Sequence, residues 1–513
     1  LTKNKCSIRM MKIILSPKVF PKANYAFMKK LGLTASLFFL LTLYGWSQSS
    51  LQQAINAFSK DPTLKHAGVG ISVVDVSSNK EIAQYDSQRS LVPASSLKVL
   101  TTASALAMLG TEYRFSTHLQ YTGSIDGNGQ LNGDLILQGA GDPTLGSPTM
   151  PGGESMEQVL DKLSMALQQK GVRKINGYII GDASFFDTKV NGSSWQWNDL
   201  GNYYGAGSWG LNFHDNLYYL RFQQTGRLGK TPRIAIIEPE IPNLRFTNEV
   251  TSASAGSGDN AYIYGAPYTY ERFVRGTIPI GSKLFSIKGS IPDPPLFAAQ
   301  QLANRLRNAG IVSEKGATSD RLLGRPLGSN PQKLLTHRSP FLKEIVERTN
   351  IKSVNLYCET LLRAIGKIKG TEGTVSGGIK ALQTFWEARG LAFAGVALED
   401  GSGLSSKNVV TAKFMAQLMR KVARDSKIYD DFRNSLPIAG KSGGMSYTLR
   451  GTSAAGKVRA KTGTLNRVRS LTGYVETKSG KLLSFSIIVN NYTGSGGLVR
   501  KKMEKVLLAM HAL

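Results

Sequence analysis

Both ends of this 513-residue chain carry strand patterns, and a long stretch of different composition lies between them. Residues 70–76 and 81–85 alternate apolar and polar side chains around a polar turn, which is typical of a β-hairpin. Residues 468–476 and 481–490 alternate in the same way, and a helical pattern follows over 497–513. We therefore expect the first and last segments to share one antiparallel sheet flanked by helices, an α+β fold.

The stretch between these ends is rich in Gly, Asn and Tyr. Short strands are expected there, for example at 131–137, 177–182 and 233–237. A helical pattern over 295–310 leads back toward the first domain. We interpret residues 116–332 as a β-rich insertion, so that residues 48–115 and 333–513 form one discontinuous domain.

The N-terminal segment has the features of an export signal. Residues 1–30 hold eight Lys or Arg and no acidic residue, and a short apolar run follows over 31–46. Together with small residues near Ser47, this pattern is typical of a cleaved secretory signal, which makes residues 1–47 a leader. The best signal begins at Met28, so we expect the true start there and export across the inner membrane to the periplasm or cell wall.

The chain is strongly basic, with a formal net charge of +28, and removing the eight positive charges of residues 1–30 still leaves +20. An exported basic protein meets anionic envelope polymers more readily than nucleic acid, and no arginine-rich aromatic platform for bases is evident. We expect no nucleic-acid partner. Peripheral contact with an anionic envelope surface and an ordinary solvated surface stay open as interpretations.

Cysteine and histidine usage argues against disulfide and metal chemistry. Cys6 falls in the leader, so Cys358 has no partner for an internal disulfide and is expected to be a small buried residue. The five histidines are scattered, without an H-E-x-x-H or comparable cluster, which disfavours a zinc peptidase. We therefore predict no metal and no cofactor.

Ser95 and Lys98 form the motif on which the functional interpretation depends. They lie three residues apart at the start of an apolar helical run over 99–109, so the Lys98 amine can take the proton of the Ser95 hydroxyl. Free N–H groups at a helix start also favour the negative charge that develops during acyl transfer. Ser77 and Lys80 have the same spacing but lie in the polar turn of the hairpin.

An amine-activated serine also needs a second hydroxyl and a cation for a substrate carboxylate. Ser353 and Asn355 begin a predicted helix, and Lys461-Thr462-Gly463-Thr464 precedes a strand. A second ammonium near Lys98 would lower its pKa. Gly463 is expected to let a substrate backbone approach the strand, and the N–H groups of Ser95 and Thr464 are candidates for an oxyanion hole.

Each triplet is unspecific alone, since K-[ST]-G also occurs at Lys441 and Lys478. The order S-x-x-K, S-x-N and K-T-G is specific, and it is the set of penicillin-binding proteins and serine β-lactamases. Further segments resemble the D-alanyl-D-alanine carboxypeptidase family typified by low-molecular-mass class C penicillin-binding proteins, peptidase family S13. These segments are 131–135, 139–145, 181–185, 400–405 and 436–440.

The resemblance implies a serine β-lactamase/transpeptidase-like domain with a large insertion, because the 258 residues from Ser95 to Ser353 exceed what a simple β-lactamase has room for. It implies release of terminal D-Ala from peptidoglycan stem peptides, and in many relatives cleavage of D,D-crosslinks, with β-lactams as covalent inhibitors. The implied catalytic residues are Ser95 as nucleophile, Lys98 as base, Ser353, Asn355 and Lys461. The implied substrate-binding residues are Thr462, Gly463, Thr464, Asp199 and Tyr204.

Alternatives remain beside this interpretation. A secreted serine β-lactamase would share the acylation chemistry but hydrolyse penicillin quickly, and a non-catalytic wall-binding protein would have a decayed site. The sequence also departs from the family pattern at Ser406, where relatives often carry a basic residue, so the preferred stem-peptide side chain stays open.

Overall fold

The computed structural model describes residues 50–513. The leader predicted for residues 1–47 lies outside this range. Among the described helices, none is long and apolar enough to cross a membrane.

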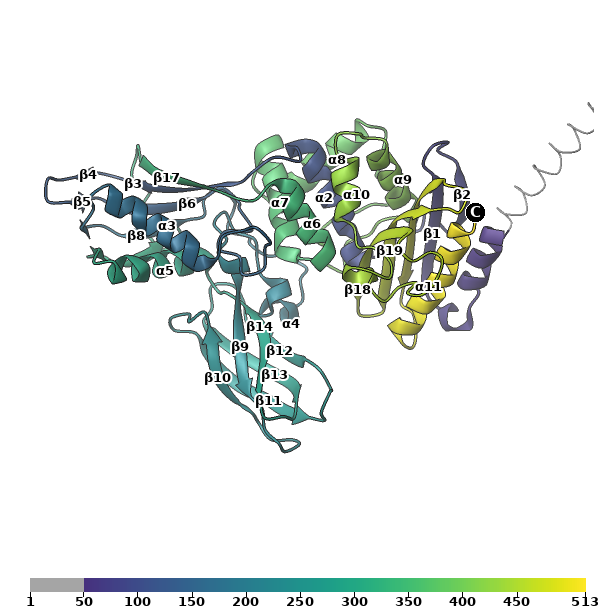
Figure 1. The fold of residues 1–513 in the computed structure, drawn as a ribbon, viewed down its shortest axis with the longest axis horizontal. Helices are drawn as coiled ribbons and strands as arrows, with labels where there is room; N and C mark the ends of the chain where they lie inside the picture. Colours follow the sequence, from purple (N-terminus) through teal and green to yellow (C-terminus); the bar gives the residue numbers. More distant parts are fainter. Residues whose placement is uncertain (1–49) are drawn as a thin grey trace, which may run out of the picture. The chain divides into compact units, whose positions relative to one another are not determined.

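One antiparallel sheet joins the two ends of the described chain (Figure 1). Its strand order is β18-β19-β20-β1-β2. The strands are β1 (Gly68–Asp75), β2 (Glu81–Tyr85), β18 (Val458–Leu465), β19 (Val468–Glu476) and β20 (Leu482–Asn490). β1 pairs with β20 from Gly68 opposite Asn490 to Asp75 opposite Leu483. The prediction that first and last segments share one sheet is confirmed, and with it the α+β class.

Both faces of this sheet are covered, because neighbouring side chains of a strand point to opposite sides. Ile487 packs in a core with α11 (Gly496–His511) and the helix over 50–59. Its neighbour Ile488 packs in a second core, formed mainly by helices. These helices are α2 (Lys98–Leu109), α6 (Leu342–Lys352), α7 (Asn355–Lys369), α8 (Val375–Glu387), α9 (Ala412–Ala423) and α10 (Tyr429–Ser435).

The residues between α2 and α6 build further sheets around a separate core, with the helices α3 (Met156–Gln169) and α5 (Pro294–Asn308). The sheet orders are β16-β8-β6-β3-β17, β15-β7-β5-β4, β10-β9-β14 and β11-β13-β12. The strands are β3 (Ser116–Tyr121), β4 (Ser124–Ile125), β5 (Gln130–Asn132), β6 (Leu135–Gly139), β7 (Lys174–Ile175), β8 (Ile179–Asp182), β9 (Leu217–Gln223), β10 (Arg233–Glu238), β11 (Arg245–Ala253), β12 (Asn260–Tyr264), β13 (Glu271–Pro279), β14 (Leu284–Ser290), β15 (Val312–Ser313), β16 (Ala317–Ser319) and β17 (Gln332–Arg338). β17 pairs with β3, so the segment that leads into α6 still belongs to this part of the fold.

The segment 131–137, predicted as one strand, is two strands in different sheets. β5 ends just before Gly133, where an added Cβ would come within 1.8 Å of the backbone oxygen of Thr122. The side chain of Asp134 then accepts a hydrogen bond from the backbone N–H of Tyr178 at 2.9 Å. These long-range contacts bend the chain between β5 and β6, and alternation within the segment does not reveal them.

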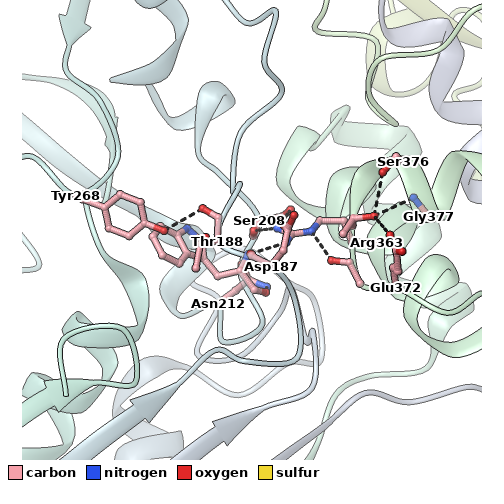
Figure 2. Close-up of polar contacts among 12 residues, drawn as sticks. Asp187, Thr188, Ser208, Asn212, Tyr268, Arg363, Glu372, Ser376 and Gly377 are labelled. Carbon is pink, nitrogen blue, oxygen red and sulfur yellow. Dashed lines mark hydrogen bonds and ion pairs between the residues drawn. The ribbon is translucent and has the colours of Figure 1, made fainter. Parts of the chain in front are cut away.

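Arg363 fastens the inserted part to α7 (Figure 2). Its guanidinium is fully buried and donates to the backbone oxygen of Ser208 and to both the backbone and side-chain oxygens of Asp187. It also donates to the backbone oxygen of Gly373 at 3.2 Å. The planar fork of donors suits several oxygens in one plane. The segment between Asp187 and Ser208 is thereby held against α7.

Candidate active site

Ser95 and Lys98 lie where the chain passes from the 3-10 turn η2 (Ala94–Leu97) into α2. The Nζ atom of Lys98 is 3.0 Å from the Oγ atom of Ser95, so the structure brings the two groups together. The turn packs against β18 and β19. Ala94, just before Ser95, has a φ of +48°, a backbone conformation that non-glycine residues rarely adopt. The serine therefore sits on a locally strained turn.

Lys98 is fully buried and has three oxygen partners. Besides Ser95, it donates to the side-chain oxygen of Asn355 at 2.6 Å and to the backbone oxygen of Ser402 at 2.7 Å. These two oxygens can only accept hydrogen bonds, whereas a serine hydroxyl can also donate. A neutral Lys98 amine therefore keeps its two N–H groups for Asn355 and Ser402 and turns its lone pair toward Ser95.

Burial lowers the pKa of Lys98 below its ordinary value of 10.5, and the nearby carboxyl groups of Glu359 and Asp400 partly oppose this. We expected a second ammonium to lower the pKa of Lys98. In the structure, burial is the cause that lowers it, and the repulsion between the two amines acts on the other lysine. Repulsion from Lys98 helps to lower the pKa of Lys461, again after burial as the larger cause. Desolvation is thus the main reason why either lysine can be neutral.

Buried Lys461 and half-buried Ser353 form a second pair. Lys461 on β18 donates to the Oγ atom of Ser353 at 2.9 Å and to the backbone oxygen of Thr462 at 3.0 Å. Ser353 ends α6 with a left-handed backbone (φ 59°, ψ 41°), and Val354 then adopts an extended conformation before α7 begins at Asn355. This sharp turn places Ser353 and Asn355 on the same side as the two lysines.

Gly463 faces the turn that carries the serine. A Cβ at this position would lie 2.4 Å from the backbone oxygen of Pro93 and 2.1 Å from the Oγ atom of Ser470. The structure therefore gives a different reason for this glycine from the one we expected, namely close packing of η2 on β18. Thr462 is half-buried beside it, and Thr464 is exposed and accepts a hydrogen bond from Arg469 at 2.6 Å.

A cleft of about 900 Å³ opens over these groups. Ser95, Ser353, Asn355 and Thr464 line it from the sheet and helices. The inserted part also contributes Asp199 and Tyr204, the two residues that the resemblance implied for substrate binding. The Tyr204 hydroxyl donates to the Asp199 carboxylate. Burial and this neighbouring carboxylate raise the pKa of Tyr204. Burial also raises the pKa of Asp199.

Asn355 connects the inserted part to Lys98. Its Nδ2 atom donates to the backbone oxygen of Tyr204 at 2.8 Å, while its Oδ1 atom accepts from Lys98. The orientation of one amide therefore fixes both contacts.

Comparison with known proteins decides the family. The model of the D-Ala-D-Ala carboxypeptidase 3 (S13) family matches residues 51–511. The chain belongs to this family. This S13 carboxypeptidase is 30% identical over 479 residues to the D-alanyl-D-alanine carboxypeptidase of Actinomadura sp. (strain R39). The matched region covers 90% of this chain and 85% of the relative. The family, the enzyme class and the fold class predicted from the sequence are confirmed.

Two solved structures are similar to the S13 carboxypeptidase over most of its length. Penicillin-binding protein 4 of Haemophilus influenzae has a TM-score of 0.77 at 25% identity, covering 90% of this chain and 99% of that one. The same protein complexed with a β-lactam has a TM-score of 0.70 at 23% identity, covering 89% and 97%.

Sequence reasoning missed the role of Glu359 in the S13 carboxypeptidase. Its buried carboxylate accepts hydrogen bonds from the backbone N–H groups of Gly401 (3.2 Å) and Ser402 (2.7 Å), and so orients the Ser402 carbonyl toward Lys98. Burial, with repulsion from Asp400, raises the pKa of Glu359 to about 7. The local sequence offers no signal that singles Glu359 out, since Asn355 and Arg363 are also polar and lie one turn away on the same face of α7.

Three further residues near the site have different surroundings. Trp195 is buried and donates to the Asp400 carboxylate at 2.9 Å, which makes it part of the support of the 400–405 loop. Trp197 is exposed and contacts Tyr264, with ring centroids 5.0 Å apart. Ser406 lines the cleft at the position where relatives often have a basic residue.

Proposed function

We propose that Ser95 is the acyl-enzyme nucleophile of a penicillin-sensitive serine D,D-peptidase that acts on peptidoglycan stem peptides. The observation that carries this is the 3.0 Å contact between buried Lys98 and Ser95 at the cleft, with the remaining partners of Lys98 being acceptors. Neutral Lys98 takes the hydroxyl proton as Ser95 Oγ attacks the carbonyl carbon of the penultimate D-Ala. The C–N bond to the terminal D-Ala then breaks.

Ser353 and Lys461 carry the proton to the departing amine. Their 2.9 Å hydrogen bond, close to Lys98, supports a relay in which Ser353 donates to the leaving nitrogen and is reprotonated from the lysines. Thr462 and Thr464 on β18 hold the terminal carboxylate together with Lys461, whose charged form this carboxylate favours. Water then attacks the Ser95 ester with Lys98 as base, and Ser95 regains its proton.

Asp199 and Tyr204 bind the side chain of the stem peptide's third residue. The exposed end of the Tyr204–Asp199 pair offers a carboxylate to a cationic group, as a diamino-acid side chain would present. Cleavage of D,D-crosslinks belongs to the same chemistry, since an acceptor amine replaces the terminal D-Ala as leaving group. We further propose export to the periplasm or cell wall, where this substrate occurs.

Release of D-Ala tests the proposal. The wild-type protein is incubated with a pentapeptide ending in D-Ala-D-Ala and with the same peptide ending in D-Ala-L-Ala, beside Ser95→Ala. Release from the first peptide alone, absent in Ser95→Ala, supports a D,D-peptidase. Fast hydrolysis of benzylpenicillin without release of D-Ala would instead identify a β-lactamase, and inactivity on every substrate would favour a wall-binding protein.

A further inference from the structure

One wall of the cleft has no part in the reaction described above. It comes entirely from the inserted part, whereas Ser95 and Thr464 line the cleft from η2 and β18. Its residues, called here the insertion wall, are Gln196, Asn198, Tyr203, Asp259, Tyr262 and Lys288. At about 900 Å³ the cleft is near the upper end of the usual range for ligand pockets, so a terminal D-Ala-D-Ala unit leaves much of it unfilled.

The insertion wall is rigidly built. Asn202 accepts a hydrogen bond from the backbone N–H of Ile263 at 3.1 Å and donates to the oxygen of the same residue at 3.2 Å. From the other side, the Oγ atom of Ser290 donates to the backbone oxygen of Leu200 at 2.7 Å. Both β12 and β14 are therefore fixed to the segment that carries Tyr203 and Tyr204. Preorganised groups of this kind bind a ligand at low entropic cost.

The same contacts exclude one kind of ligand. β12 is the edge strand of its sheet, and an extended peptide could in principle add to such an edge. Asn202 occupies both the N–H and the carbonyl of Ile263 on this free edge. A ligand at the insertion wall must therefore contact side chains rather than extend the sheet.

The exposed side chains suit a sugar. Tyr203 and Tyr262 are 47% and 43% exposed, so part of each ring is open to a ligand. The ammonium of Lys288 lies 5.4 Å from the centre of the Tyr203 ring, and Gln196 and Asn198 add amide groups. Aromatic rings offer an apolar face with a polar end. This combination matches the C–H faces, hydroxyls and acetamido groups of an N-acetylated sugar.

We propose that the insertion wall binds the N-acetylated sugar to which the stem peptide is attached. This inference rests on the proposed function, because the sugar and the terminal D-Ala lie at opposite ends of a stem peptide. With the D-Ala end at Ser95, the peptide passes Asp199 and Tyr204 and directs its sugar end toward Tyr262 and Tyr203. The insertion thus selects substrates that are still joined to glycan.

The test compares one pentapeptide ending in D-Ala-D-Ala, free and attached to its N-acetylated disaccharide. We expect kcat/KM for the disaccharide form to be about 5-fold higher in the wild type, and this ratio to fall toward 1 in Tyr262→Ala and Tyr203→Ala. Tyr447→Ala is the matched control, since Tyr447 is 71% exposed and lies outside the cleft. It keeps the wild-type ratio. Thermal unfolding of each variant verifies that it is folded.

The outcomes separate the two proposals. Equal kcat/KM for both substrates in the wild type, or an unchanged ratio in both tyrosine variants, overturns the sugar subsite while leaving the peptidase intact. Failure of the wild type to release D-Ala from either substrate overturns the proposed function itself.

Discussion

Lys98 donates a hydrogen bond to the side-chain oxygen of Asn355 across 2.6 Å, although 257 positions separate the two residues. The amide nitrogen of the same Asn355 holds the backbone oxygen of Tyr204, which belongs to the inserted part. One side chain therefore joins Lys98, the S-x-N motif and the inserted part. We therefore expect a substitution in any of these three segments to change the reactivity of Ser95.

The charge state of Lys98 predicts the pH dependence of acylation. Only a neutral amine can accept the Ser95 proton, and burial lowers the pKa of Lys98 below 10.5. The rate of acylation by benzylpenicillin should therefore rise with pH as the solution passes through this lowered pKa. Lys98→Met should slow acylation by about 10²–10⁴-fold. Lys80→Met, in the other S-x-x-K sequence, is the control and should keep the wild-type rate and profile.

Glu359 predicts an effect of pH on stability. Its pKa is about 7 in the folded protein and 4.5 ordinarily, so between these values the folded state binds a proton that the unfolded chain has lost. The free energy of unfolding should therefore decrease as pH rises from about 5 to about 8, on the order of 3 kcal/mol from this group. Glu359→Gln lacks this contribution. Measured by urea unfolding, the stability of Glu359→Gln relative to the wild type should therefore improve from about pH 5 to about pH 8. If the free energies of unfolding of the two proteins changed in parallel with pH, the raised pKa of Glu359 would be contradicted.

Gly463 should tolerate no side chain. In Gly463→Ala, the new methyl group would meet the backbone oxygen of Pro93 and push the serine-bearing turn away from β18. We expect a loss of about 1–3 kcal/mol of stability and acylation slower by about 100-fold. Gly226→Ala is the matched control, since a Cβ there meets nothing within 4 Å. Equal acylation rates in the two variants would refute the packing role.

Arg363 should contribute strongly to stability through the inserted part. Arg363→Met removes the donors to Asp187, Ser208 and Gly373, and these groups lose a buried partner. We expect a loss of about 3 kcal/mol, measured by calorimetry, and earlier proteolytic cleavage near Asp187. Arg245→Met breaks an exposed pair with Glu271 and should cost less than about 1 kcal/mol. A similar small loss in both variants would speak against the anchoring role.

The sequence predicted what depends on local spacing. A serine and a lysine three apart share a helical face, and alternating residues form strands, so the contact between Ser95 and Lys98 and the central sheet could be predicted from short segments. Contacts between segments that are distant in the sequence could not be predicted in this way. Nothing in the local pattern records that Glu359 reaches the loop at Gly401, or that β11 pairs in parallel with β13.

Gly463 shows most clearly what a local sequence pattern cannot predict. Its need for a small residue could be suspected from the motif, but the cause lies in Pro93 and Ser470, which are distant in sequence or on the next strand. The domain boundaries stay predictions, as do the roles of the site residues, and the experiments above address these roles.

Intact mass spectrometry after incubation with benzylpenicillin tests most directly whether Ser95 is the nucleophile. The experiment uses the wild-type protein beside Ser95→Ala, with drug consumption followed in parallel. We predict a stable adduct of one penicillin on the wild type and none on Ser95→Ala. An adduct that persists in Ser95→Ala, or an unmodified wild-type protein with the drug intact, would contradict Ser95 as the nucleophile of a penicillin-sensitive peptidase.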